Sequence, residues 1–364
     1  MKQGWEIKKI KDICDKASSN IAQNKIADID GDYPVFGASG FVQNVNFFHR
    51  DSPYVGIVKD GAGVGRVNIY PAYSSLLGTL QYIIPKKGFS LEYVAYALKS
   101  LNLSSFASGA TIPHIYFKNY GESPIPVPPL AEQEKIVAEL DCLSGIIEKK
   151  KQQLKELDAL AQSIFYEMFG NPVDNEKGWD TKQIEDICDV YRGGSPRPID
   201  KFLGGNIPWI KIGDATQGDS IFLTKTKEHI IEEGLRKTRF IHSGSLIFAN
   251  CGVSLGFARI ITFDGCIHDG WLAFDNISEE IDKIFFLKSL NFCTPYFRSI
   301  APDGVQPNLN TSIMKAFNQI IPPLIIQKNF VDKICSIEKQ KSLITQSLGE
   351  AEVLYKSRMD YYFN

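Results

Sequence analysis

The sequence has 364 residues, 44% of them hydrophobic and 23% charged, a composition typical of globular proteins. At roughly 150 residues per domain, this length favours two or three domains. The formal net charge of −2 argues against a nucleic-acid binder when the chain is taken as a whole, because affinity for a phosphate backbone depends on Lys and Arg. No apolar stretch approaches the roughly 18 to 20 residues that cross a bilayer, and the first residues lack the apolar region of a signal peptide. We therefore expect a cytoplasmic protein without membrane contact.

The chain begins with a stretch that it later repeats. GWEIKKIKDICD, at residues 4–15, returns as GWDTKQIEDICD at residues 178–189. The two copies agree at eight of twelve positions, including a Trp in a chain that has only four. Self-similarity of this kind indicates repeated structural units. We expect an internal pseudo-twofold repeat.

Each opening is followed by a body with mixed patterning. Between residues 31 and 85, short alternating runs such as YVGIV predict strands joined by tight turns. Residues 90–101 then predict an amphipathic helix with Ser90 as its N-cap. The second body repeats this order, with strands expected over residues 244–263 and a helix over residues 279–291. Two mixed α/β globules are predicted.

Both bodies end in a loop that leads into Pro-Pro-Leu-x-x-Gln. The loops ATIPHI (110–115) and GVQPNL (304–309) share a Pro with an apolar residue two positions later. The first prolines of the two Pro-Pro-Leu motifs, 128 and 322, lie 194 residues apart, whereas the Gly-Trp openings lie 174 apart. The second copy therefore has about 20 extra residues. Pro129 suits a first helical position, so a helix can begin there. The spacing does not explain why Gln133 and Gln327 are both Gln.

The segments after the two motifs predict long helices. In each, apolar residues recur at alternating steps of four and three, the heptad pattern of a helix seam, and Lys150 occupies a gap in the first. About 40 residues make a helix of roughly 60 Å. Gly170 and Pro172 are expected to end the first one. The predicted seam consists of Ile136, Leu140, Leu143, Ile147, Leu154, Leu157, Ile164, Phe330, Ile334, Ile337, Ile344 and Leu348.

Motifs that carry catalysis are missing from the sequence. VKDGAGVGRVNIY contains G-x-G-x-G, but it continues into a β-like stretch rather than a helix, which predicts a turn instead of a phosphate loop. The five His do not lie in a metal-ligand spacing, and the seven Cys form no C-x-x-C. An odd Cys count argues against a disulfide framework, so reduced residues are expected. We expect no catalytic residues, metal or cofactor in this chain.

The sequence resembles the specificity (S) subunits of type I restriction-modification systems. The resemblance covers the whole chain and rests on PPLAEQEKIVAELD with its tail through FYEMFG, on PPLIIQKNF, and on YRGGSPRPIDKFLGGNIPWIKIGD at residues 191–214. It implies an α+β (mixed α/β) fold with target-recognition domains at residues 1–127 and 171–321. Two spacer helices, at residues 128–170 and 322–364, would pack antiparallel as a coiled coil.

The resemblance also implies a function and partners. Each recognition domain would read one half of a bipartite site in double-stranded DNA, and the helices would set the spacing. The chain would dock modification (M) subunits, which use S-adenosylmethionine, and restriction (R) subunits, which use ATP with Mg²⁺. Polar side chains on loops are the usual readers of base edges. The candidate readers are Lys59, Arg66, Thr111, His114, Arg192, Ser195, Arg197, Asn250, Arg259, Gln306 and Asn308.

Two other interpretations compete with this one. A tandem α/β module on a coiled-coil spacer could bind protein rather than DNA, and the nearly neutral charge favours it. A nucleic-acid enzyme acting alone is disfavoured by the missing motifs. DNA binding measured with and without a methyltransferase partner separates the three.

Overall fold

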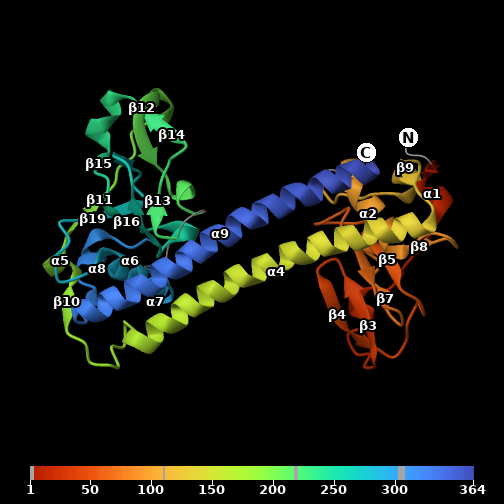
Figure 1. The fold of residues 1–364 in the computed structure, drawn as a ribbon, viewed down its shortest axis with the longest axis horizontal. Coiled ribbons are helices and arrows are strands. Elements are labelled where there is room, and N and C mark those ends of the chain that lie inside the picture. The colour runs from red at the N-terminus through yellow and green to blue at the C-terminus, as the bar shows by residue number, and fades with distance from the viewer. Residues whose placement is uncertain (1–3, 110, 217–219, 302–307) are drawn as a thin grey trace. The chain divides into compact units, whose positions relative to one another are not determined.

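The computed structural model describes residues 4–109, 111–216, 220–301 and 308–364 (Figure 1). The chain divides into two compact units: unit 1 comprises residues 1–151 and 347–364, and unit 2 comprises residues 152–346. Unit 1 contains the first body (residues 1–127) and unit 2 the second body (residues 171–321). Both divisions fall inside long helices, because the helix ends complete the hydrophobic cores of the bodies.

The first body is built on a four-stranded antiparallel sheet, ordered β2-β8-β5-β6. β5 (Tyr54–Val58) is buried along its whole length, and α2 (Leu91–Ser100) packs on the sheet. Ser90 caps α2 as the sequence predicts, because its Oγ accepts a hydrogen bond from the Tyr93 N–H at 3.2 Å. The other elements are β1 (Glu6–Lys9), α1 (Ile10–Ile13), β2 (Cys14–Ser18), a 3-10 turn (Gln23–Lys25), β3 (Tyr33–Gly37), β4 (Gly40–Val45), β6 (Val67–Tyr70), β7 (Ser75–Leu76), β8 (Leu80–Pro85), a 3-10 turn (Leu103–Phe106), α3 (Phe117–Tyr120) and β9 (Pro124–Val127).

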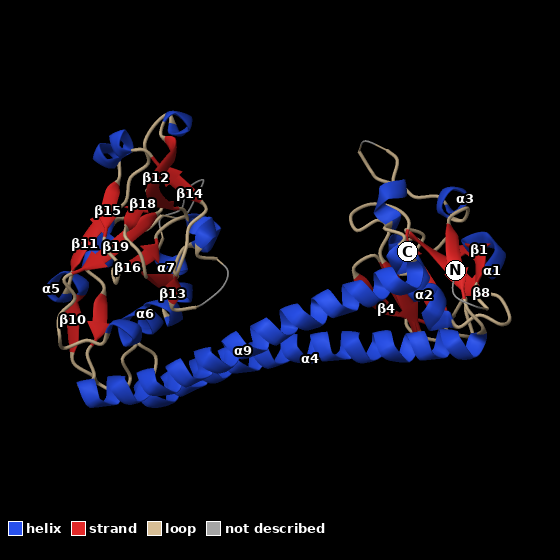
Figure 2. Cartoon of the chain, turned by 45° about the horizontal axis from the view of Figure 1, so that its top comes forward, coloured by secondary structure: helices blue, strands red, loops and turns tan. Residues whose placement is uncertain are grey.

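The second body contains a five-stranded sheet, ordered β11-β19-β16-β17-β13, and a four-stranded sheet, ordered β14-β12-β18-β15 (Figure 2). The helix predicted over residues 279–291 begins only at Lys283, because Asp282 Oδ1 accepts hydrogen bonds from the backbone of Ile284 and Phe285 and so caps it. The elements are β10 (Thr181–Gln183), α5 (Ile184–Ile187), β11 (Asp189–Arg192), β12 (Leu203–Ile210), β13 (Phe222–Leu223), β14 (Glu228–Ile230), β15 (Arg239–Ile241), β16 (Leu246–Ala249), β17 (Ala258–Ile261), β18 (Gly265–Ile267), β19 (Trp271–Asp275), α6 (Lys283–Phe292), α7 (Thr294–Ile300), α8 (Thr311–Lys315) and β20 (Asn318–Ile320), with 3-10 turns at Ile199–Lys201, Ile212–Asp214, Glu232–Lys237 and Gly252–Ser254.

The two bodies repeat one frame, which confirms the repeat predicted from the sequence. β1 pairs with β9, and β10 pairs with β20, both antiparallel. Cys14 and Cys188 take equivalent places, since each Sγ donates to the carbonyl four residues earlier, that of Ile10 or Ile184. The first body adds a three-stranded sheet, β4-β3-β7, where the second adds its four-stranded one. Most of the extra residues of the second copy lie there, between β11 and β16.

The two long helices are continuous. α4 (Leu130–Phe169) and α9 (Leu324–Phe363) have 40 residues each. α4 begins one residue after Pro129, whose carbonyl accepts from the backbone of Glu132 and Gln133. It ends as predicted at Gly170, which has a φ of +73° that glycine adopts without steric cost.

The predicted seam residues have two different environments. In unit 2, Phe330, Ile334 and Ile337 are buried in the core of the second body. In unit 1, Ile136 and Leu140 are buried in the core of the first body, where Met359, Tyr362 and Phe363 of α9 join them. Of the remaining seam positions, Ile147 is buried and the others are half-buried: Leu143, Leu154, Leu157, Ile164, Ile344 and Leu348.

The seam pattern missed two buried aromatic side chains of α4, Phe165 and Phe169. Phe165 is fully buried, while its seam neighbour Ile164 is only half-buried. Phe165 packs against Phe285 and Phe292 of α6 and Phe330 of α9, with ring centroids 4.7 to 6.1 Å apart. The end of α4 thus belongs to the aromatic core of the second body, which a helix-pair pattern does not predict.

Ion pairs join α4 and α9 within each unit. In unit 1, Arg358 binds the Glu139 carboxylate with two nitrogens and lowers the pKa of Glu139, and Lys151 lies 3.3 Å from Glu352. As α4 advances from 139 to 151, its partners on α9 retreat from 358 to 352, so the helices run antiparallel there. In unit 2, Lys341 of α9 reaches Asp158 of α4 at 2.6 Å.

A buried polar cluster connects the second body to α9 through hydrogen bonds and an ion pair. Lys288 of α6 donates to Glu338 Oε1 at 2.9 Å and to Ser220 Oγ at 2.8 Å. The Lys288 and Glu338 side chains are only 7% and 11% exposed. Burial raises the pKa of Glu338, but the Lys288 charge and the Ser220 hydroxyl outweigh it and leave that pKa below its ordinary value. Removing Glu338 would leave Lys288 buried without a carboxylate, and removing Lys288 would leave Glu338 with only the Ser220 hydroxyl and Lys341, at 3.4 Å.

Candidate functional site

The repeated Gln of Pro-Pro-Leu-x-x-Gln connects the long helix to its body by hydrogen bonds, a contact that we call the brace. Gln133 is 1% exposed; its Oε1 accepts from the Ser90 N–H and its Nε2 donates to the Pro128 carbonyl, both at 2.9 Å. Because Ser90 caps α2, Gln133 ties the start of α4 to the start of α2. An apolar or shorter side chain could not satisfy both backbone groups.

The second body has the same brace. Gln327 Oε1 accepts from the N–H of Asp282, the cap of α6, at 2.7 Å. Its Nε2 donates to the carbonyls of Pro322, at 2.6 Å, and Glu280, at 3.0 Å. Each body is therefore attached to its own long helix by hydrogen bonds of the equivalent Gln side chain.

At equivalent places in the two bodies, the loop before Pro-Pro-Leu crosses the end of a central strand. In the first body the Ile115 N–H donates to the Lys59 carbonyl at 2.9 Å, just beyond β5. In the second, the Leu309 N–H donates to the Asn250 carbonyl at 2.8 Å, just beyond β16. We call these places the strand-end sites. The two sites share this backbone hydrogen bond and differ in their side chains.

The strand-end site of the first body brings Lys59 and His114 together around Asp60. His114 Nδ1 lies 2.7 Å from Asp60 Oδ1, and Lys59 Nζ lies 3.2 Å from Asp60 Oδ2. Sequence reasoning missed Asp60, although it directly follows Lys59. The carboxylate orients both candidates and offsets part of the positive charge of Lys59.

Arg66 and Thr111 are both exposed in the first body. Arg66 follows the G-x-G-x-G segment, in which all three glycines have positive φ, and its guanidinium donates to the carbonyls of Ala62 and Gly63. That segment joins β5 to β6, so the predicted turn is confirmed.

In the second body, the position of Asn250 differs from the one expected of a base reader. It is fully buried, and its Nδ2 donates to the Leu309 carbonyl at 3.0 Å and to Asn308 Oδ1 at 3.1 Å. Asn250 therefore holds the loop in place instead of presenting its amide outward. Asn308 is half-buried, and Gln306 lies outside the described residues.

Three other candidates of the second body gather at Asp269. Ser195 Oγ donates to Asp269 Oδ1 at 2.8 Å, Arg192 Nε donates to the Asp269 carbonyl at 3.2 Å, and Arg197 Nη2 lies 4.0 Å from Oδ2. His268 stands beside them, with a pKa that burial lowers. Neither Asp269 nor His268 was predicted, since they lie more than 70 residues away in the chain.

Arg259 lies apart from this group. It is half-buried on β17, with its guanidinium 5.0 Å from the centre of the Phe257 ring and Nη1 donating to the Ala258 carbonyl. Burial, and to a lesser extent the charges of Lys341 and Arg259, lower the pKa of Lys288 on α6.

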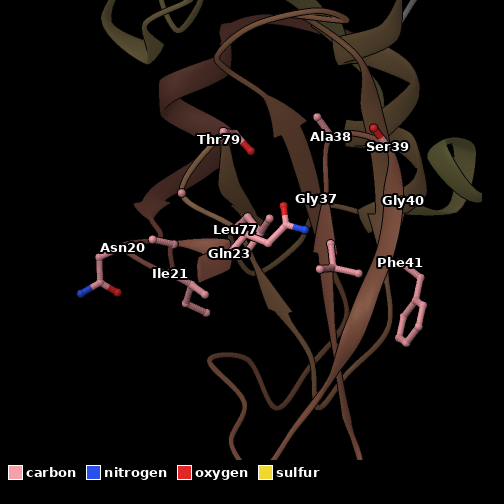
Figure 3. A pocket seen from close by; sticks show the side chains of 13 residues that line it. Asn20, Ile21, Gln23, Gly37, Ala38, Ser39, Gly40, Phe41, Leu77 and Thr79 are labelled. Carbon is pink, nitrogen blue, oxygen red and sulfur yellow. The ribbon is translucent and has the colours of Figure 1, made fainter. Parts of the chain in front are cut away.

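A hollow of about 750 Å³ adjoins the strand-end site of the first body (Figure 3). Thr79 lines it, and the Thr79 carbonyl accepts from the backbone N–H groups of Lys59 and Asp60. Figure 3 shows the Gln23 amide toward the middle, with Asn20 and Phe41 at the two rims. Its side chains are neutral, which suits hydrogen bonding to uncharged groups rather than to phosphate. The lining residues are Asn20, Ile21, Ala22, Gln23, Gly37, Ala38, Ser39, Gly40, Phe41, Val42, Leu77, Gly78 and Thr79.

Metal and membrane features were also sought in the part of the chain that the structure describes. There, no group of three or more His, Cys, Asp or Glu side chains could hold a metal ion. No helix of that part is long and apolar enough to cross a membrane.

Comparison with known proteins gives a consistent result. The model of the type I restriction modification DNA specificity domain matches residues 2–159 and 176–353. The type I restriction enzyme MjaIX specificity subunit of Methanocaldococcus jannaschii is 27% identical over 298 residues, covering 70% of this chain and 68% of that protein. A putative type I restriction enzyme specificity subunit of Haemophilus influenzae is 22% identical over 350 residues, covering 92% of this chain and 87% of that protein.

The fold is also known. The crystal structure of the S subunit of a type I restriction-modification system from M. genitalium superposes with a TM-score of 0.63 at 16% identity, covering 99% of this chain and 96% of that one. The family model accounts for more than half of the sequence, in two copies that coincide with the two repeats. The chain therefore belongs to the family of type I restriction-modification specificity subunits and carries its DNA specificity domain twice.

Proposed function

We propose that this chain is the DNA-recognition subunit of a type I restriction-modification complex, in which each body reads one half of a bipartite site. One observation carries the proposal. The two bodies share their mounting, down to the braces of Gln133 and Gln327, while the side chains at the strand-end sites differ. Two readers of unlike half-sites on a common scaffold require this combination.

The local charge supports DNA as the ligand, despite the net charge of −2. Residues 1–127 contain 13 Lys and Arg against 10 Asp and Glu. Residues 191–260 contain 10 Lys and Arg against 6 Asp and Glu, whereas residues 261–282 contain 6 carboxylates and no basic residue. A separation of charge along the chain lets part of a body attract phosphates although the whole does not.

The long helices are proposed to act as spacer and docking surface. Their antiparallel course within unit 1 fits a coiled-coil pair. α9 also leaves large apolar side chains exposed: Val353 is 71%, Ile325 66% and Leu343 61% exposed. Such positions suit contact with another protein. Methyltransferase subunits are the expected occupants, with restriction subunits joining the complex.

Catalysis is assigned to those partners. In this proposal they use S-adenosylmethionine, and ATP with Mg²⁺, while this chain holds no cofactor and performs no chemistry. A location in the cytoplasm is part of the same proposal.

Selection of bound duplexes from a random pool tests the proposed function. The chain is purified with and without co-expressed methyltransferase subunits, and retained DNA is sequenced. The expected result is a bipartite consensus with a fixed gap from the complex. A complex that forms but enriches no sequence would indicate a protein-interaction module. Methylation or ATP hydrolysis by this chain alone would contradict the non-catalytic assignment.

A further inference from the structure

A notch of about 350 Å³ lies between the edges of the two sheets of the second body. β11 is an edge strand of the five-stranded sheet, and β15 is an edge strand of the four-stranded sheet. The two strands lie side by side in both views (Figure 1, Figure 2). The notch is lined by Arg192, Gly193, Gly194, Lys237, Thr238, Arg239 and Phe240.

Each of the three basic side chains in the notch contacts an aromatic ring or a backbone carbonyl that orients it. The Arg239 guanidinium lies 4.5 Å from the centre of the Tyr191 ring, and Lys237 Nζ lies 4.7 Å from that of Phe202. Arg192 uses Nε for the Asp269 carbonyl, which leaves its terminal nitrogens for another acceptor. Supports of this kind reduce the rotamer entropy that binding an anion would cost.

The notch has no carboxylate among its lining residues, although carboxylates occur nearby. Asp269 accepts a hydrogen bond from Ser195 and lies 3.0 Å from His268 Nδ1. Asp275 lines an adjoining hollow that includes Lys283 and shares Arg239 and Phe240 with the notch. The Thr238 hydroxyl is already used, because it donates to the Ile267 carbonyl at 2.9 Å. The unused hydrogen-bonding capacity of the notch is therefore cationic.

Two glycines beside the notch allow backbone segments to approach closely. A Cβ on Gly193 would lie 2.2 Å from the His268 carbonyl oxygen, and a Cβ on Gly194 would lie 2.7 Å from that of Lys237. No other residue fits this close backbone approach. It brings the start of the Arg192 loop against the Lys237–Arg239 segment.

We propose that this notch binds one phosphodiester group of the DNA backbone at the half-site of the second body. The inference rests on the proposed function and adds a site to it. Three basic residues that line one notch without a neutral amide or a carboxylate match the charge of a phosphate, whereas a base edge also presents donors that require acceptors. Phe240, 42% exposed at the same notch, suits contact with the adjoining sugar. Arg192 is thereby reassigned from reading bases to positioning the duplex.

The salt dependence of binding tests the site. The complex with methyltransferase subunits is compared with its Lys237→Gln, Arg239→Gln double variant on duplexes that carry the selected site or a single change in its second half. Loss of one phosphate contact lowers the slope of log Kobs against log salt by about 0.9. Between 50 and 200 mM salt, the wild-type advantage then shrinks about 3.5-fold. All duplexes should weaken by the same factor.

Two control variants separate loss of the phosphate contact from other effects of the substitutions. A Lys328→Gln, Lys333→Gln double variant removes an equal charge at two exposed positions on α9 and should leave the slope unchanged. Arg239→Lys keeps the positive charge, so its slope should be close to that of the wild type. A purely structural role of Arg239 would not predict this result.

Three results would overturn the inference. One is an unchanged slope in the double variant. The second is a change in preference among the single-base variants with the slope intact, which would make these residues base readers. The third, a wild-type complex that binds no bipartite site, would overturn the proposed function together with the notch; the first two leave that function standing.

Discussion

Replacing Gln133 by Ala should loosen the first body from α4. The substitution leaves the Ser90 N–H and the Pro128 carbonyl without their partner. At about 1 to 3 kcal/mol for each of the two unsatisfied groups, the expected loss is about 2 to 6 kcal/mol. At roughly 2 to 4 °C per kcal/mol for a unit of this size, the thermal midpoint should fall by about 4 to 24 °C.

The effect should be largest where Gln133 acts. Hydrogen exchange is measured by mass spectrometry on peptides that cover α2, together with thermal unfolding of the purified chain. Exchange at the first turn of α2 should accelerate, because Ser90 both caps that turn and is held by Gln133. Gln152→Ala is the matched control, since Gln152 is exposed and donates only to Glu156. If both variants lost the same stability and exchanged alike, the brace would have no energetic role.

Three further predictions concern unit 2 and the long helices. Lys288→Ala should destabilise unit 2 by about 3 kcal/mol in urea unfolding, because it leaves the Glu338 carboxylate buried without its main partner; a loss below about 1 kcal/mol would contradict this. Since the folded pKa of Glu338 lies below its ordinary value of 4.5, the wild-type chain should lose stability as pH falls from 4.5 through that lowered pKa, and Glu338→Gln should flatten this dependence. Inserting four residues after Gln152 adds about 6 Å and roughly 40° beyond a full turn, so selected DNA should show a gap longer by one or two base pairs with the half-sites unchanged; a fixed gap would mean that the helices do not set it.

The sequence predicts most of the scaffold because its signals are local or repeated. The Ser90 cap, the Gly170 stop and the turn before Arg66 depend on neighbours within a few residues. The Gly-Trp openings and the Pro-Pro-Leu motifs revealed the repeat because the frame of each body depends on the same side chains.

The contacts that fix the candidate sites are mostly nonlocal, and spacing could not predict them. Gln133 meets a residue 43 positions earlier, and Ser195 meets Asp269 74 positions later. Asn250 was chosen as a polar side chain after a strand, and only the fold reveals that its amide is buried. Phe165 fell outside the seam because, besides Phe330 of α9, it packs against Phe285 and Phe292 of α6 in the second body.

Exchange of one body tests the central claim most directly. The first body, residues 1–127, is replaced by that of a relative, the chain is co-purified with its methyltransferase subunits, and bound duplexes are selected from a random pool. One half of the consensus should change, while the other half and the gap between them stay as in the wild type. A change in both halves, or in neither, would contradict independent reading by the two bodies.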